Sequence, residues 1–282
     1  MSSALRLVSP LRAGTTRRYL MCPPRYFTVS YRINPWMNPS TPVDTARAMA
    51  QWQALVDTQR ALGHTVELID PQPDLPDMVF AANAGTVIDG AVLGARFRNA
   101  DRAPEAEHYR RWFAAQGGPA VVMPNMINEG AGDLMWTGSV LLAGTGFRTE
   151  PAAHREAQEV LGVPVVSLQL VDPYYYHLDT CLLVLDDSPS SPLIAYYPAA
   201  FSPGSRRVLA RLFPDAVIAS AADAACLGLN GVSDGRSVIL PQEVVTLGHA
   251  LAARGFEPIF IDISILRQAG GGPKCCTLEL RP

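Results

Sequence analysis

The chain has 282 residues, of which 48% are hydrophobic and 17% are charged. This composition is typical of a globular protein with a large core, and it excludes an intrinsically disordered chain. The formal net charge is −3 at pH 7, so the sequence lacks the basic surplus that would favour nucleic acid or an anionic membrane surface as a partner. No apolar run approaches the roughly 18 residues that a membrane-spanning helix needs.

The cysteines and the N-terminus bear on the cellular compartment. The five cysteines are Cys22, Cys181, Cys226, Cys275 and Cys276. Their odd number and irregular spacing do not form a disulfide framework, and no spacing of Cys or His indicates zinc. Residues 1–20 lack the apolar segment of a signal peptide. We therefore expect a cytoplasmic protein with reduced thiols and no metal or cofactor, and an N-terminal tail over residues 1–20 that can be flexible.

Five helices are predicted along the chain, and each is followed by a strand. The helices are expected at about 42–62, 104–116, 151–161, 203–213 and 242–254, and the strands after them at about 65–69, 120–123, 165–168, 216–219 and 258–261. Other strand-like runs lie at 78–80, 86–88, 92–93, 134–136, 140–143, 181–185, 193–197, 237–240 and 277–280. Thr41 is the expected N-cap of the first helix, and Gly63 its stop.

These elements fall into about five units of roughly fifty residues. Each unit combines one helix with two or three strands, which is more strands than a simple alternation of strand and helix would give. The pattern predicts an α/β arrangement of small sheets around an axis, with loops converging near its centre. Because no long Pro/Gly/Ser linker divides the chain, residues 21–282 are expected to form a single domain.

The most unusual stretch is Gly270 to Thr277, which reads GGGPKCCT. Three glycines allow a close backbone approach to a ligand, and a short strand follows. A nucleophilic thiolate needs an electropositive, partly accessible position, which Lys274 or a bound cation could supply. The other interpretation is a glycine turn before an ordinary C-terminal strand.

Two further motifs carry titratable groups. In Tyr176–His177–Leu178–Asp179, strand alternation would place His177 and Asp179 on one side, where the carboxylate would raise the pKa of the imidazole. In the sequence NEGAGD, Glu129 could act as a general acid/base and Asp133 could position it or contact substrate. The alternatives are a polar strand end and a hairpin turn rich in Gly and Asp.

Three more groups complete the candidate set. Asp77 and Asn83 lie on a run that is expected to be a buried strand, and Arg96 and Arg148 lie at strand ends. Two arginines placed in this way could grip a carboxylate through forked hydrogen bonds. The alternative for each arginine is a surface salt bridge.

Together these stretches resemble the guanidine-modifying enzymes of the pentein superfamily, which include arginine deiminase, dimethylarginine dimethylaminohydrolase, arginine dihydrolase and the amidinotransferases. The resemblance runs from about Met21 to the C-terminus. It implies a five-bladed α/β propeller of ββαβ-type units around a central active site. It also implies a hydrolase acting on C–N bonds in linear amidines, with a small-molecule substrate.

The resemblance also implies roles for residues. GGGPKC resembles the nucleophile loop, which makes Cys275 rather than Cys276 the nucleophile. HLDT resembles the general-base motif, so His177 is the acid/base and Asp179 a guanidinium-binding carboxylate. EGAGD resembles the EGGD motif and gives Glu129 the second carboxylate role, although its extra residue leaves the alignment between Glu129 and Asp133 open.

GFRT and ARF resemble the stretches with the carboxylate-binding arginines, which implies this role for Arg148 and Arg96. Asp77 would meet the substrate amino group. The segment 21–37 resembles the catalytic module of the arginine dihydrolases, and Asn83 stands where the deiminases have an aspartate. Two carboxylates facing a guanidinium favour it over neutral citrulline, and an amide in one position weakens that preference.

The favoured reading is therefore an arginine dihydrolase that converts arginine to ornithine, carbon dioxide and two ammonia molecules through a covalent thiouronium intermediate. The alternatives are a dimethylarginine dimethylaminohydrolase, an arginine deiminase, an amidinotransferase and, in another class, a non-catalytic ligand-binding propeller. A homo-oligomer stays open. The segment 22–27 is the expected lid over the site.

Overall fold

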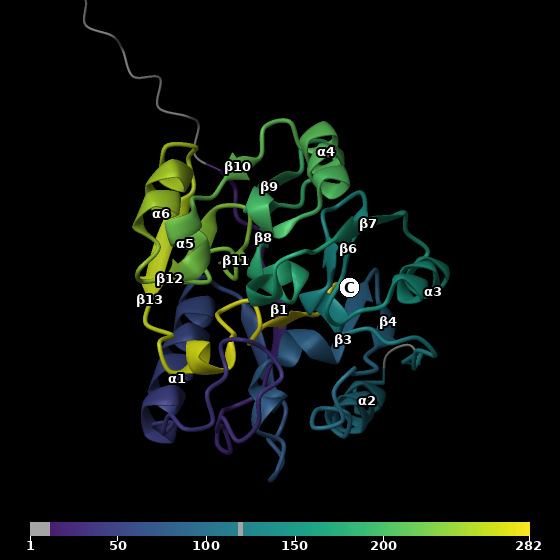
Figure 1. Cartoon of the computed structure of the whole chain (residues 1–282), viewed down its shortest axis with the longest axis vertical. Coiled ribbons are helices and arrows are strands. Elements are labelled where there is room, and N and C mark those ends of the chain that lie inside the picture. The colour runs from purple at the N-terminus through teal and green to yellow at the C-terminus, as the bar shows by residue number, and fades with distance from the viewer. Residues whose placement is uncertain (1–11, 118–120) are drawn as a thin grey trace, which may run out of the picture.

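The computed structural model describes residues 12–117 and 121–282. Small sheets occupy the middle of the molecule and helices lie around its rim, so the protein has an α/β fold (Figure 1). Most of the expected tail, residues 1–11, and the first residue of the strand expected at 120–123 lie outside the described residues. None of the helices in the described ranges combines the length and the apolar character that crossing a bilayer requires.

All five predicted helices are confirmed, and a short sixth helix, α5, was not predicted. They are α1 (Thr45–Ala61), α2 (Glu105–Ala115), α3 (Pro151–Leu161), α4 (Pro203–Leu212), α5 (Ala221–Ala225) and α6 (Val245–Ala252). Helix α1 begins later than expected because Asp44, not Thr41, is its N-cap. The Asp44 side chain accepts a hydrogen bond from the backbone N–H of Arg47 at 2.9 Å.

The described strands form five separate sheets. They are β14 (Leu278–Glu279), β1 (Arg18–Met21) and β2 (Thr65–Leu68); β3 (Gly85–Ile88) and β4 (Ala91–Gly94); β5 (Leu134–Trp136), β6 (Leu141–Thr145) and β7 (Val165–Gln169); β8 (Leu182–Asp186), β9 (Leu193–Tyr196) and β10 (Val217–Ile218); and β11 (Val232–Ser233), β12 (Ser237–Pro241) and β13 (Glu257–Ile261). In each three-stranded sheet the middle strand is antiparallel to one neighbour and parallel to the other.

Every sheet contributes an edge strand to the lining of a common central cavity, namely β3, β5, β8, β11 and β14, and β1 adds the side chain of Tyr19. Each of these strands is the edge strand that pairs antiparallel within its sheet. The helices pack on the outer strands, as where Trp52 and Leu55 of α1 share a buried cluster with Ile261 of β13. The expectation of small sheets grouped around an axis therefore agrees with the arrangement of these five edge strands.

The strand expected at 78–80 is wrong, and so is the strand alternation considered for the HLDT motif. Within the described part of the strand expected at 120–123, Val122 forms an isolated bridge to Leu93. The run that carries Asp77 and Asn83 forms the 3-10 helices Pro76–Val79 and Ala81–Ala84. Its backbone bonds locally or to the nucleophile loop, since the N–H of Ala82 donates to the Cys275 carbonyl at 3.0 Å. The HLDT motif likewise forms a 3-10 helix, Leu178–Thr180, which begins after His177.

The end of the expected tail belongs to the folded core. Residues 18–20 form most of strand β1, and the side chains of Tyr19 and Leu20 are buried. The Arg12 guanidinium lies 2.8 Å from the Asp186 carboxylate, and Arg17 pairs with Asp187 at 2.6 Å. Residues 17–20 of the expected tail therefore pack with the folded core.

Candidate active site

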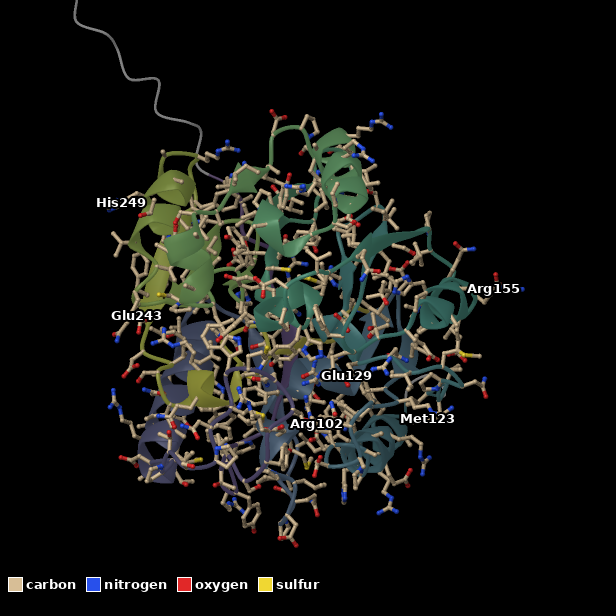
Figure 2. All side chains as sticks on the ribbon, viewed as in Figure 1. Arg102, Met123, Glu129, Arg155, Glu243 and His249 are labelled. Atoms are coloured by element: carbon tan, nitrogen blue, oxygen red, sulfur yellow. The ribbon has the colours of Figure 1, made fainter. Side chains whose placement is uncertain are left out.

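The candidate residues gather at one end of the central edge strands. Asn83 precedes β3, Glu129 precedes β5, Asp179 precedes β8, Asn230 precedes β11 and Cys275 precedes β14. All five side chains are buried. Figure 2 places Glu129 and Arg102 near the middle of the molecule, whereas Arg155 and His249 lie at its rim. Five loops from distant parts of the chain thus converge on one buried site.

The thiol of Cys275 is held by two polar side chains. Its Sγ lies 3.4 Å from Asp179 Oδ2, to which the S–H donates, and the Asn230 side-chain N–H donates to Sγ at 3.1 Å. The Asn230 Oδ1 accepts from the backbone N–H groups of Gly272 at 2.9 Å and Cys275 at 3.1 Å. Burial, and then the charge of Asp179, raise the pKa of Cys275 well above its usual value. Both effects favour the neutral thiol over the thiolate.

The glycine run lets the nucleophile loop pack tightly. A Cβ atom on Gly271 would lie 2.1 Å from the ring of Phe80, so no side chain fits there. The expected electropositive neighbour, Lys274, does not bond to the thiol. Its ammonium contacts the Thr277 carbonyl at 3.4 Å, and its charge acts on Cys275 only through space.

His177, Glu129 and Arg148 form a second cluster. Glu129 Oε2 lies 2.7 Å from His177 Nε2 and 2.7 Å from Arg148 Nη1. Burial by itself would raise the pKa of Glu129, but Arg148 and His177 outweigh burial and hold that pKa well below its usual range. The guanidinium of Arg148 also lies 4.7 Å from the centre of the Tyr176 ring. A charged carboxylate is thus fixed between a cation and an imidazole.

Three buried polar atoms at the site have no hydrogen-bond partner among the described residues. They are His177 Nδ1, Asp77 Oδ1 and Asp179 Oδ1. Burial raises the pKa of Asp179 to about 6 and also raises the pKa of Asp77. Buried carboxylate oxygens normally have donors, so the site matches a cationic ligand with several N–H groups.

Asn83 is partly engaged by the protein. Its Oδ1 accepts from Arg102 Nη1 at 2.8 Å, and its Nδ2 donates to the Glu129 carbonyl at 3.2 Å. One N–H and one lone pair of the amide stay available to a ligand. Sequence reasoning missed Arg102, which is buried and bonded to both carboxylate oxygens of Glu105 at 2.9 and 2.8 Å. Arg102 reaches Asn83 only through the tertiary fold, and Arg102 belongs to none of the motifs identified in the sequence.

Asp133 is occupied by backbone groups. Its Oδ1 accepts from the N–H of Leu178 at 3.0 Å, and its Oδ2 accepts from the N–H of Thr149 at 3.2 Å. Burial raises the pKa of Asp133. The carboxylate therefore ties three loops together, and Glu129 rather than Asp133 contacts His177.

The two candidate arginines are not brought together. Arg148 lies at the site, but Arg96 is exposed and its guanidinium donates to the Asn125 carbonyl. Arg98, which sequence reasoning missed, is also exposed, but it contacts the site residues. Its backbone N–H donates to Glu129 Oε1 at 3.1 Å and its Nε to the Arg148 carbonyl at 2.7 Å. Because Arg96 and Arg98 are two residues apart in one extended run, the pattern could not separate them.

Residues 31–36, which we call the covering segment, make hydrogen bonds at the site, and the lid expected at 22–27 stays a prediction. The Tyr31 hydroxyl donates to Asp77 Oδ2 at 2.9 Å, and the Ile33 carbonyl accepts from Arg148 Nη2 at 2.9 Å. Trp36 Nε1 donates to the Tyr174 carbonyl at 2.9 Å. Within the described residues, no group of three His, Cys, Asp or Glu side chains is placed to hold a metal ion.

Tyr31→Phe is expected to raise KM for the substrate about tenfold with little change in kcat, because it removes one charge-assisted hydrogen bond of about 1.5–3 kcal/mol from the covering segment. Steady-state kinetics of ammonia release measure both constants. Tyr26→Phe is the matched control, since the Tyr26 side chain is exposed. An unchanged KM for Tyr31→Phe would count against closure by this segment.

No family model matches the chain, but several known proteins are similar to it. A dimethylarginine dimethylaminohydrolase of Mycobacterium tuberculosis is 50% identical over 281 residues, covering 99% of this chain and 91% of that protein. The bifunctional arginine dihydrolase/ornithine cyclodeaminase AgrE of Nostoc is 36% identical over 269 residues, which cover 93% of this chain and 38% of AgrE. The chain thus spans well under half of the bifunctional relative.

Solved structures agree with these relatives. The N-terminal domain of ArgZ, described as an arginine dihydrolase from cyanobacteria and solved bound to substrate, superposes with a TM-score of 0.89 at 36% identity, covering 94% of this chain and 98% of that one. A dimethylarginine dimethylaminohydrolase structure superposes with a TM-score of 0.75 at 19% identity, which supports the fold alone.

The fold and the relatives show that the protein is a hydrolase. It acts on C–N bonds, other than peptide bonds, in linear amidines. Its substrate is a small molecule. The chain belongs to the pentein-fold family of dimethylarginine dimethylaminohydrolases and arginine dihydrolases.

Proposed function

We propose that the protein hydrolyses the guanidinium of free L-arginine as an arginine dihydrolase, with Cys275 as the nucleophile. The observation that carries this proposal is the pair of buried, unpartnered carboxylate oxygens, Asp77 Oδ1 and Asp179 Oδ1, in the site that holds the Cys275 thiol. A guanidinium and an amino group together supply the charge and the N–H donors that these oxygens lack. Arg98 lies beside this site and can bind the substrate carboxylate, whereas both terminal nitrogens of Arg148 already donate to Glu129 and to the Ile33 carbonyl.

The first half of the reaction forms a covalent intermediate. The bound cation stabilises a thiolate at Cys275, and Asp179, which accepts the thiol hydrogen bond, is placed to take the proton. The thiolate attacks the guanidinium carbon. His177, oriented by Glu129 at 2.7 Å, protonates the departing nitrogen, so ammonia leaves and a thiouronium stays bound to sulfur.

The second half releases the product. His177 removes a proton from water, which attacks the thiouronium carbon, and the sulfur departs as the leaving group. The product is citrulline. The free N–H and lone pair of Asn83 suit a neutral ureido group, so we propose that citrulline is attacked a second time. That round gives ornithine, carbon dioxide and a second ammonia.

A product assay tests the proposal. The enzyme is incubated with arginine, and ornithine, citrulline and ammonia are quantified over time. The proposal expects ornithine with two ammonia molecules for each arginine consumed. Citrulline as the sole product would remove the dihydrolase assignment and leave a deiminase.

One observation favours a second candidate. The 50% identity to the Mycobacterium tuberculosis protein exceeds the 36% identity to the dihydrolases, which supports dimethylarginine dimethylaminohydrolase activity. The discriminating measurement is dimethylamine release from asymmetric dimethylarginine, compared with ammonia release from arginine at the same concentration. A kcat/KM for the methylated substrate well above that for arginine would establish this candidate.

Asn83→Asp is expected to lower the ratio of ornithine to citrulline about tenfold, which corresponds to about 1.4 kcal/mol. A carboxylate prefers the guanidinium to the neutral ureido group, although the charge of Arg102, 2.8 Å from Oδ1, offsets part of the effect. Amino-acid analysis of the products measures the ratio. Asn38→Asp adds the same charge at an exposed position and serves as control; an unaltered ratio in Asn83→Asp would mean that Asn83 does not decide the product.

We also propose that the five sheets are the blades of a five-bladed propeller within a single catalytic domain. Its support is that one edge strand of every sheet lines the same cavity. A cytoplasmic location stays a prediction from the cysteines. Assembly into homo-oligomers stays open, and sedimentation would measure it.

A further inference from the structure

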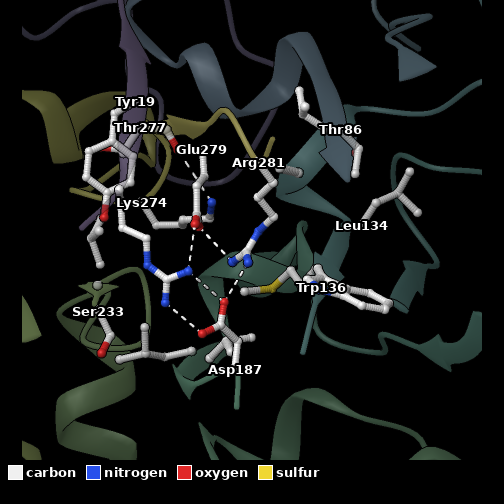
Figure 3. Close-up of a pocket in the computed structure, with 18 of the residues that line it drawn as sticks. Tyr19, Thr86, Leu134, Trp136, Asp187, Ser233, Lys274, Thr277, Glu279 and Arg281 are labelled. Atoms are coloured by element: carbon white, nitrogen blue, oxygen red, sulfur yellow. Dashed lines mark hydrogen bonds and ion pairs between the residues drawn. The ribbon is translucent and has the colours of Figure 1, made fainter. Parts of the chain in front are cut away.

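A cavity with both apolar and charged lining lies behind the nucleophile loop, between the five edge strands. Lys274, Thr86 and Tyr19 are among its lining residues (Figure 3). The catalytic candidates occupy the loops before these strands, whereas the cavity is lined by the strands themselves. Its volume is about 60 Å³, and a single water needs roughly 10–15 Å³ measured in the same way. The cavity therefore holds a few waters or one small ion.

One ammonium in the cavity, that of Lys274, contacts no carboxylate among the described residues, although Glu279 and Asp179 act on it through space. Arg17 pairs with Asp187 at 2.6 Å and with Glu279 at 3.1 Å. Arg281 pairs with the same two carboxylates, so these four groups neutralise one another. Lys274 adds a further positive charge, and among the described residues its ammonium contacts only the Thr277 carbonyl, at 3.4 Å. Figure 3 shows the Lys274 side chain reaching toward this network.

Three more polar atoms in the cavity walls have no hydrogen-bond partner within the described part of the chain. They are Tyr19 Oη, Thr86 Oγ1 and Arg17 Nε. The Tyr19 and Thr86 side chains are only 1% and 3% exposed, so bulk water does not satisfy them. All three can donate. Donors in the same cavity as an ammonium that contacts no carboxylate match an anion, because a cation would be repelled by Lys274.

We propose that this cavity binds a small monovalent anion, of halide or bicarbonate size, and that the anion acts on the nucleophile through Lys274. The ammonium supplies the charge, and the hydroxyls of Tyr19 and Thr86 supply directed donors. Burial lowers the pKa of Lys274, and a bound anion would favour its charged form. Because Lys274 is adjacent to Cys275 in the chain, an anion at its ammonium opposes a negative charge on the thiol.

Crystals soaked in sodium bromide test the site directly. We expect an anomalous peak within about 3.5 Å of Lys274 Nζ, at the distance of an ammonium–anion contact. The double variant with Tyr19→Phe and Thr86→Val should lose the peak, because it removes both hydroxyls and keeps the shapes of the side chains. Tyr26→Phe, outside the cavity, should retain it. Ordered water in place of bromide in the unaltered protein would overturn the proposal.

The effect on the nucleophile is measured by labelling. The rate of Cys275 alkylation by uncharged iodoacetamide is followed by peptide mass spectrometry while chloride or bicarbonate replaces isethionate at constant ionic strength. We expect at least a threefold slower reaction in the unaltered protein and none of this slowing in the double variant. The more effective of the two salts identifies the natural anion. A bromide peak without any effect on labelling would mean an adventitious ion only, and the proposal would fail. Neither readout depends on the identity of the guanidine substrate.

Discussion

Cys275→Ser is expected to lower kcat/KM for arginine by roughly 10⁴-fold or more, because a serine hydroxyl at this position has no comparable anionic form. The change is nearly isosteric, so the contacts with Asn230 and Asp179 can persist and the site keeps its geometry. Ammonia release under steady-state conditions measures the loss. Intact-mass spectrometry of the quenched reaction should show the thiouronium adduct on the unaltered protein and none on the variant.

The neighbouring thiol provides the matched control. Cys276 is buried next to Cys275 and belongs to the core cluster that includes Leu55 of α1. Cys276→Ser is expected to cost about 1–3 kcal/mol of unfolding free energy, since it buries a hydroxyl, while kcat/KM changes by less than about threefold. The reverse outcome, with activity lost in Cys276→Ser and retained in Cys275→Ser, would exchange the two assignments.

The helices were predictable because their signals are local. A proline in the first turn of α3 and α4 and a glycine directly after α3 define their limits without any tertiary contact. The run from Asp77 to Asn83 has no such signal. It looks like a strand because it is apolar, yet its backbone groups bond to the nucleophile loop, which is almost two hundred residues further along the chain. The spacing of apolar residues along the chain carries no information about that contact.

The site residues also fall into a group that the sequence predicts and a group that it does not. Cys275, His177 and Glu129 lie in unusual local sequences, and the resemblance to a family named them. Asn230 lies in an ordinary turn before β11, yet its amide holds both the thiol and the backbone of the nucleophile loop. Arg102 is similar, because its role consists of contacts with Asn83 and Glu105. Such supporting residues are defined by the geometry that they stabilise, so a single sequence leaves them unmarked.

Glu129→Gln is expected to lower kcat/KM by about 10²- to 10⁴-fold, because His177 loses the charge that orients it as acid and base. It should also lower the unfolding free energy by about 3–5 kcal/mol, since the Arg148 guanidinium is 3% exposed and would lose its buried partner. Both quantities are measured on one preparation, with kinetics well below the melting temperature and unfolding in urea.

The dependence of stability on acid pH distinguishes Glu129 from Asp133. The folded-state pKa of Glu129 lies below its ordinary value of 4.5, so its stabilisation is present above that value and is lost as the pH falls through the lower folded-state pKa. Glu129→Gln should therefore make the protein less sensitive to acid as well as less stable at neutral pH. Asp133→Asn is the matched control, because Asp133 accepts two backbone N–H groups and its pKa is raised. It should lose stability while keeping most of the activity. Equal loss of activity in both variants would mean that the two carboxylates act through loop geometry and that the charge on Glu129 has no separate role.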